Sequence, residues 1–142
     1  MKKVLMVVGI LFGVVIIALA AFLGYAAMQP SEIHLERSTV VDASPSEVFP
    51  FVHDLRSFVE WSPWSGRDPA QTVEFSDPST GVGAWYSWDG NDEVGVGKMT
   101  ITAVATDAKV AHELAFFEPW ESAADVSFLL AAEGEGTKVT WT

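Results

Sequence analysis

The sequence predicts an α+β domain: one antiparallel sheet of about seven strands with two short helices after its first strand, preceded by a transmembrane helix. Three observations support this prediction. Of the 25 positions from Val4 to Met28, 22 are apolar. Two short helical patterns lie between positions 44 and 60, after a first alternating stretch. From position 72 onward, six β-like runs are separated only by turn-forming residues, which is typical of an antiparallel meander.

The apolar stretch is long enough to cross a bilayer. At ~1.5 Å per residue its uncharged helix would measure ~37 Å, against a hydrocarbon core of ~30 Å. A cleavable signal peptide is the alternative, because Ala18-Leu19-Ala20 fits a small-x-small cleavage site. The run stays apolar as far as Met28, which favours an anchor. We therefore expect an anchor over residues 1–30 and a single domain over residues 31–142.

Two features of the anchor segment predict its surroundings. Lys2 and Lys3 precede it, so the positive-inside rule places the N-terminus in the cytoplasm and the domain outside it. We thus expect a single-pass membrane protein that contacts the membrane through residues 4–28. Gly9 and Gly13 form a G-x-x-x-G pair, which could bring two helices together as a weak homodimer. The alternative is that these glycines are incidental, since small residues are common in membrane helices.

The domain that follows is strongly acidic. All 19 acidic residues lie after Pro30 with only six basic ones, which gives the domain a formal net charge of −13. Nucleic acid and anionic lipid head groups are excluded as expected partners, because they would find no basic surface. The chain has no cysteine, which excludes disulfides, thiolate metal sites and a cysteine nucleophile.

The first part of the domain reads as strand, helix, helix. Residues 33–42 alternate in polarity and predict the first strand. Ser44-Pro45-Ser46-Glu47 then has an N-cap serine, a first-turn proline and a capping-box glutamate. Pro50 predicts that this helix is short or kinked, because proline removes a backbone hydrogen bond. A second short helix is expected from Leu55 to about Glu60.

The rest of the domain is predicted to be strands and turns. The β-like runs are 72–76, 84–88, 97–106, 109–117, 123–132 and 137–141. Short segments rich in aspartate, glycine and proline separate them, which favours hairpins. An antiparallel sheet must cover its apolar face, and the two short helices are the only helices in the domain that could do so.

The glycine-rich turns do not predict a cofactor site. Gly81-Val82-Gly83 lacks the third glycine of a dinucleotide loop, and Gly97-Lys98-Met99 lacks the hydroxyl residue of a phosphate loop. Residues 89–93 resemble a calcium loop, but Val94 stands where its glycine is required. We interpret all three as hairpin turns and predict no cofactor.

The histidines do not predict a metal centre either. His34, His53 and His112 share no metal-ligand spacing, so no metal site is expected. His112 shares a strand face with Leu114 and Phe116, which makes it either a pocket residue or a buried, hydrogen-bonded histidine. No residue pattern identifies a catalytic group.

Tryptophan and tyrosine gather at loops and strand ends. Their polar N–H and O–H groups need partners, so such clusters often line clefts or interfaces. Packing in the core is the alternative. The candidate ligand-lining residues are Trp61, Trp64, Tyr86, Trp88, His112, Phe116 and Trp120.

Four strings of residues carry a family resemblance. They are 36–38 leading to 41–49, 52–55 leading to Trp61-Ser62-Pro63-Trp64, residues 83–95, and the closing 136–141. Together with the element order, they resemble the START-like helix-grip (SRPBCC) superfamily and, within it, the polyketide cyclase/dehydrase-type proteins, over about residues 33–142. The resemblance implies a curved sheet wrapped around a long C-terminal helix, with a ligand cavity between them.

The sequence departs from this family at its end. It stops at Thr142, directly after an alternating run, and the long C-terminal helix is missing. The resemblance therefore implies that the domain is truncated or that another surface closes its cavity. A concave apolar face left open is rare in monomeric soluble proteins, so we expect residues 31–142 alone to have low stability or to self-associate.

Three functions are compatible with these patterns. The resemblance and the aromatic cluster favour a membrane-anchored module that binds a hydrophobic or amphipathic small molecule, lipid-like or polyketide-like, over the concave face of the sheet. A cyclase/dehydratase-type enzyme that uses His53, His112 or Glu113 as acid and base is one alternative. An envelope accessory protein that docks a partner chain through exposed tryptophans is the other.

Overall fold

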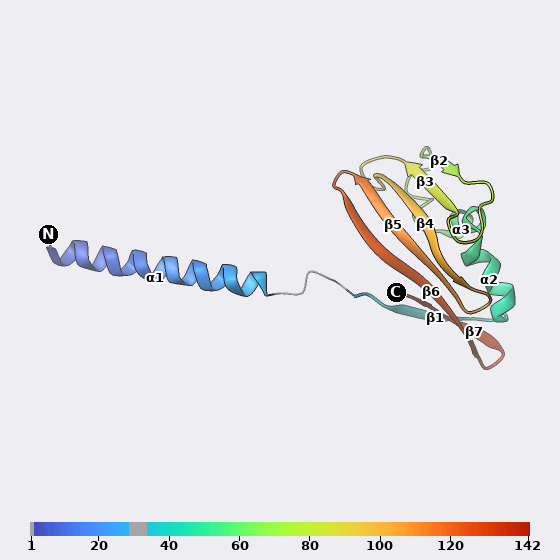
Figure 1. Cartoon of the computed structure of the whole chain (residues 1–142), viewed down its shortest axis with the longest axis horizontal. Helices are drawn as coiled ribbons and strands as arrows, with labels where there is room; N and C mark the ends of the chain where they lie inside the picture. The colour runs from blue at the N-terminus through green and yellow to red at the C-terminus, as the bar shows by residue number, and fades with distance from the viewer. Residues whose placement is uncertain (1, 29–33) are drawn as a thin grey trace. The chain divides into compact units, whose positions relative to one another are not determined.

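The computed structural model describes residues 2–28 and 34–142, without the side chains of residues 2–5, 7, 8, 10 and 11. The chain divides into two compact units, Met1–His34 and Leu35–Thr142. The first unit contains helix α1 (Lys2–Ala27) (Figure 1). Among the described residues no helix was found that is both long and apolar enough to cross a membrane, so the expected transmembrane helix is not supported.

The second unit is built on one antiparallel sheet of seven strands, in the order β1-β7-β6-β5-β4-β3-β2. The sheet curves around the side on which two short helices lie (Figure 1). The predicted α+β class, with a curved antiparallel sheet and two short helices after the first strand, is confirmed. The elements are β1 (Arg37–Val41), α2 (Pro45–His53), α3 (Leu55–Trp61), β2 (Thr72–Phe75), β3 (Trp85–Asp89), β4 (Val96–Ala105), β5 (Lys109–Glu118), β6 (Ser122–Glu133) and β7 (Gly136–Trp141).

The first strand is shorter than its alternating pattern. The sequence predicts it over 33–42, whereas the structure has it over 37–41, and Ile33 lies outside the described residues. Within residues 34–142 the strand is at the edge of the sheet and pairs with β7, from Arg37 opposite Trp141 to Val41 opposite Thr137. Each residue of an edge strand needs a partner residue on the neighbouring strand, so the length of β1 is set by the length of β7.

Helix α2 begins with the predicted capping box. The carboxylate of Glu47 accepts hydrogen bonds from the Ser44 N–H at 2.9 Å and from the Ser44 hydroxyl at 2.6 Å. These bonds favour the charged carboxylate and lower the pKa of Glu47. The helix ends at His53, three residues after Pro50, so it is short as expected.

Asp54 separates the two helices. Its backbone is extended, with φ −93° and ψ 115°, so the chain leaves α2 and starts α3 in a new direction. Its carboxylate accepts from the Arg56 N–H at 3.0 Å, which caps α3, and from the Ser79 hydroxyl at 2.8 Å. Asp54 therefore fixes α3 against the loop that precedes β3.

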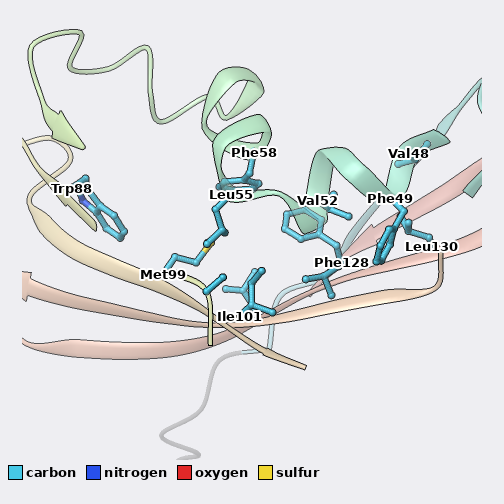
Figure 2. Close-up of a cluster of buried hydrophobic side chains, with 13 residues drawn as sticks. Val48, Phe49, Val52, Leu55, Phe58, Trp88, Met99, Ile101, Phe128 and Leu130 are labelled. Carbon is cyan, nitrogen blue, oxygen red and sulfur yellow. The ribbon is translucent and has the colours of Figure 1, made fainter. Parts of the chain in front are cut away.

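The core lies between these helices and the concave face of the sheet. Figure 2 shows Val52 and Leu55 pointing from the helices toward Ile101 and Phe128 on the sheet. Every second residue of β5 and β6 contributes to this face, among them the buried Val110, Val126 and Leu130. Within residues 34–142 no helix follows α3, so the concave face beyond the two helices is the part that is left open.

Candidate functional site

A cavity of about 730 Å³ lies between α3, the loop 62–71 and the concave face of the sheet. Its lining falls into three groups by burial. The buried floor comprises Phe58, Ser62, Trp88, Met99, Val126 and Phe128. The half-buried wall comprises Val59, Ser65, Gln71, Val73, Tyr86, Val94, Leu114 and Phe116. The exposed rim comprises Trp61, Pro63, Trp64, Arg67, Glu93 and Trp141.

Three of the six floor residues are aromatic, and their rings pack against each other or against a ring of the wall. The Phe58 ring lies edge-on to that of Phe128 at 5.9 Å between centroids, and Trp88 lies edge-on to Phe116 at 5.6 Å. Phe58 reaches the floor from α3, which Asp54 positions, whereas Trp88, Phe128 and the wall residue Phe116 come from strands of the sheet. Figure 2 shows Phe58 and Trp88 at this side of the core, with Met99 between them on the sheet.

Two of the indole N–H groups of the cavity lining are used within the protein. The Trp88 indole N–H donates to the Val94 carbonyl at 3.0 Å, and that of Trp61 donates to the Phe51 carbonyl at 2.8 Å. With these donors satisfied, both indoles offer apolar ring surface to the cavity. A ligand that contacts them meets aromatic carbon and no free donor.

Gly97 makes room for Trp88 on the floor. It lies on β4 directly opposite Trp88 on β3, and a Cβ at this position would overlap the six-membered part of the indole ring. It would also approach the Ala115 carbonyl oxygen to 2.7 Å. A residue without a side chain is therefore required here for the indole to lie flat on the sheet.

Tyr86 brings a hydroxyl group next to the aromatic rings of the lining. Its ring lies 5.5 Å from that of Trp88 and 6.1 Å from that of Phe58, between centroids. Burial raises the pKa of its hydroxyl to about 12, because a phenolate would lose its hydration there. The hydroxyl is therefore a neutral group at physiological pH.

The charged residues of the lining are at the rim. The guanidinium of Arg67 lies 4.8 Å from the centre of the Trp64 ring, and Trp64 is 59% exposed. Glu93 is the carboxylate on the lining and is also exposed. The cavity thus grades from a buried apolar floor to a charged, solvated mouth, which suits an apolar or amphipathic molecule.

The predicted ligand-lining residues do not all line the cavity. Five of the seven line the cavity: Trp61, Trp64, Tyr86, Trp88 and Phe116. Trp120 does not; it lies in the turn between β5 and β6 and is 80% exposed. His112 does not line the cavity either.

His112 is enclosed in the core beside the floor. It is 1% exposed, and its ring lies 5.9 Å from Phe128 and 6.4 Å from Phe58, between centroids. Neither ring nitrogen has a hydrogen-bond partner of good geometry in the part of the chain that the structure describes. Burial lowers the pKa of His112 to about 4; the Val52 backbone opposes this, and nearby His53 adds to it.

The other residues considered for acid–base chemistry also lie away from the cavity lining. The His53 Nε2 accepts a hydrogen bond from the Gly81 N–H at 3.1 Å, so it holds the loop before β3. Glu113 is exposed on β5, on the face opposite to that of Leu114. Across the described residues, no group of three or more metal-ligating side chains is close enough to hold a metal ion.

Much of the floor lies outside the residues that the sequence predicts. Phe58, Met99, Val126 and Phe128 are not among the candidates, most of which are aromatic residues at loops and strand ends. A usable signal was present on the strands. Leu114 and Phe116 alternate along β5, as Val126 and Phe128 do along β6, and both pairs are on the concave face.

No family model matches the sequence, and no curated protein matches it. Several solved structures are similar to the structure of this chain. The Aha1 dimer from Colwellia psychrerythraea is similar at 18% identity and a TM-score of 0.56, over 78% of this chain and 74% of that one. CalU16 from Micromonospora echinospora is similar at 15% identity and a TM-score of 0.52, over 75% of this chain and 56% of that one.

DynU16, from the dynemicin biosynthetic locus, is similar at 18% identity and a TM-score of 0.53, over 75% of this chain and 35% of that one. The fold is START-like, of the helix-grip type. At these identities the likeness concerns the fold alone. The cavity lies on the concave face of the sheet, as expected, but it is bordered by α3 and the loop 62–71, and within residues 34–142 no long C-terminal helix closes it.

Proposed function

We propose that the helix-grip domain is a binding module for a hydrophobic or amphipathic small molecule. The observation that carries the proposal is the cavity of about 730 Å³ with its buried apolar floor. Ligand pockets are typically ~300–1,000 Å³ in volume and mostly apolar, with few polar groups that orient the ligand. The cavity fits this description in both size and chemistry.

Burial of the exposed rim would contribute favourable free energy to ligand binding. Trp61, Trp64 and Trp141 are exposed apolar side chains that border the cavity. A ligand that covers them gains roughly 25 cal/mol for each Å² of apolar surface removed from water. Its polar end would remain at the mouth, near Arg67 and Glu93.

Filling the cavity is expected to abolish most of this binding. Leu114→Trp places an indole in the cavity wall, so the full chain should bind the neutral fluorescent probe N-phenyl-1-naphthylamine at least about tenfold more weakly. The probe's fluorescence rises in an apolar site, and a titration gives the Kd.

A tryptophan on the opposite face of the same strand is the matched control. Phe117 is exposed on β5 and does not line the cavity, so Phe117→Trp should leave the Kd unchanged. The control also removes any contribution from probe bound elsewhere on the chain. Equal affinity in the Leu114→Trp variant and the unmodified chain would refute the proposed site.

The location of the module is a second, separate proposal that rests on the sequence. We propose that residues 4–28 attach it to a membrane, with the N-terminus cytoplasmic and the domain extracytoplasmic. The support is the run of 22 apolar residues in 25 positions after Lys2 and Lys3. The homodimer through Gly9 and Gly13 stays a prediction of the same kind.

Alkaline extraction of membranes tests this location. We expect the full chain to stay in the membrane pellet, and a variant lacking residues 4–28 to appear in the soluble fraction. Protease added outside the intact membrane should digest the domain. Recovery of the full chain in the soluble fraction would contradict the proposal.

A further inference from the structure

The hydroxyl of Tyr86 is a polar group that the protein itself does not use. No hydrogen bond to it is found within residues 34–142, although the ring lies against Trp88, Phe75 and Phe58. The fully enclosed polar atoms without a partner in the described part of the chain are the ring nitrogens of His112. The Tyr86 oxygen therefore keeps accessible surface, and its residue lines the cavity.

The Tyr86 hydroxyl differs from two other polar groups of the cavity lining, which are bonded within the protein. The Trp88 N–H donates to the Val94 carbonyl, and the Ser65 hydroxyl donates to the Val59 carbonyl at 2.7 Å. Leaving a half-buried hydroxyl without a partner costs free energy unless something else bonds to it. A water molecule or a ligand atom must supply that bond.

We propose that the Tyr86 hydroxyl donates a hydrogen bond to an uncharged carbonyl oxygen of the bound molecule. The inference rests on the proposed function, because it assigns the chemistry of the ligand that the cavity holds. The ligand class is then an apolar molecule that carries a ketone, aldehyde or ester group part-way along its body, against the wall between Trp88 and Phe58.

The charge distribution of the lining is the reason for an uncharged group. Arg67 and Glu93, the charged side chains of the lining, are exposed at the rim. No charge lies on the buried floor to compensate an ionised ligand group there, and burying an unpaired charge is costly. With its pKa raised to about 12, the Tyr86 hydroxyl stays protonated and remains a donor.

Two isosteric probes test this contact. 2-Acetylnaphthalene carries a carbonyl, and 2-isopropenylnaphthalene has a CH₂ group in place of the oxygen. Equilibrium dialysis against the full chain and its Tyr86→Phe variant gives four dissociation constants. We expect the variant to bind the ketone about tenfold more weakly and the alkene within about twofold of the unmodified chain, since it loses one hydrogen bond and little ring surface.

Ser65→Ala is the matched control, because it removes a cavity hydroxyl that is already bonded within the protein. Its effect on the two probes should be equal. A Tyr86→Phe variant that weakens both probes equally, or neither, would overturn the inference while leaving the binding module intact. If neither probe binds the unmodified chain, the proposed function fails and the inference fails with it.

Discussion

Lowering the pH from 7 to 4 is expected to reduce the free energy of unfolding by about 3 kcal/mol through His112 alone. In the unfolded chain this histidine takes up a proton near its ordinary pKa of 6.5, whereas in the folded domain it does so only near 4. Its contribution is therefore complete above pH 6.5 and is lost as the pH falls between these two values. Urea unfolding followed by near-ultraviolet circular dichroism at several pH values measures the loss.

Carboxylates also titrate in this range, so the measurement needs a variant that isolates the histidine. His112→Phe keeps an aromatic ring at this position and removes two buried nitrogens that lack partners. It should be at least as stable as the unmodified chain at pH 7 and about 3 kcal/mol more stable at pH 4. His34 is exposed, and His34→Phe should change neither value. If the free energy of unfolding has the same pH dependence in the unmodified chain and in the His112→Phe variant, the burial of His112 described above is contradicted.

Gly97→Ala is expected to destabilise the domain by about 2–4 kcal/mol. The added methyl group would overlap the Trp88 indole, and overpacking of this kind costs about 1–3 kcal/mol. Displacing the indole also breaks its hydrogen bond to Val94, worth about 1 kcal/mol. Urea unfolding at pH 7 gives the change in stability.

The same substitution should affect the cavity, since the displaced indole belongs to its floor. We expect weaker binding of N-phenyl-1-naphthylamine by the folded Gly97→Ala variant. Gly66→Ala is the control: a Cβ there would meet only the Pro63 carbonyl oxygen, at 3.9 Å, so stability should change by less than about 0.5 kcal/mol. Stability of Gly97→Ala equal to that of this control would contradict the packing described for Trp88.

Local patterns were sufficient to predict most elements of the helix-grip domain. The capping box at Ser44 and Glu47 begins α2 where it was expected, because both partners lie within one turn of each other. The six later strands lie within about a residue of their alternating runs, since period and turn residues are properties of neighbouring positions. The first strand differs because its length depends on β7, about a hundred residues away.

The lining of the cavity was harder to predict for a similar reason. His112, Leu114 and Phe116 share one strand face, so the sequence treats them alike. In the fold, α2 and α3 cover the strand at His112 and leave it open further along, so Leu114 and Phe116 line the cavity and the histidine does not. Where a helix stops covering a strand is set by tertiary packing, which the alternation of residues does not encode.

The pairing of β1 with β7 has a consequence for how the domain is made. The Thr137 hydroxyl donates to the Ala43 carbonyl at 2.7 Å across 94 residues of chain, and among the described strands β7 is the one that pairs with β1. At a synthesis rate of ~5–20 residues per second, β7 is synthesised roughly 5–20 s after β1. Once residue 133 is added, the outer edge of β6 is unpaired as well until β7 is made. Between the addition of residue 133 and that of residue 141 the nascent domain therefore exposes two unpaired strand edges, and this is when it is most open to misassembly.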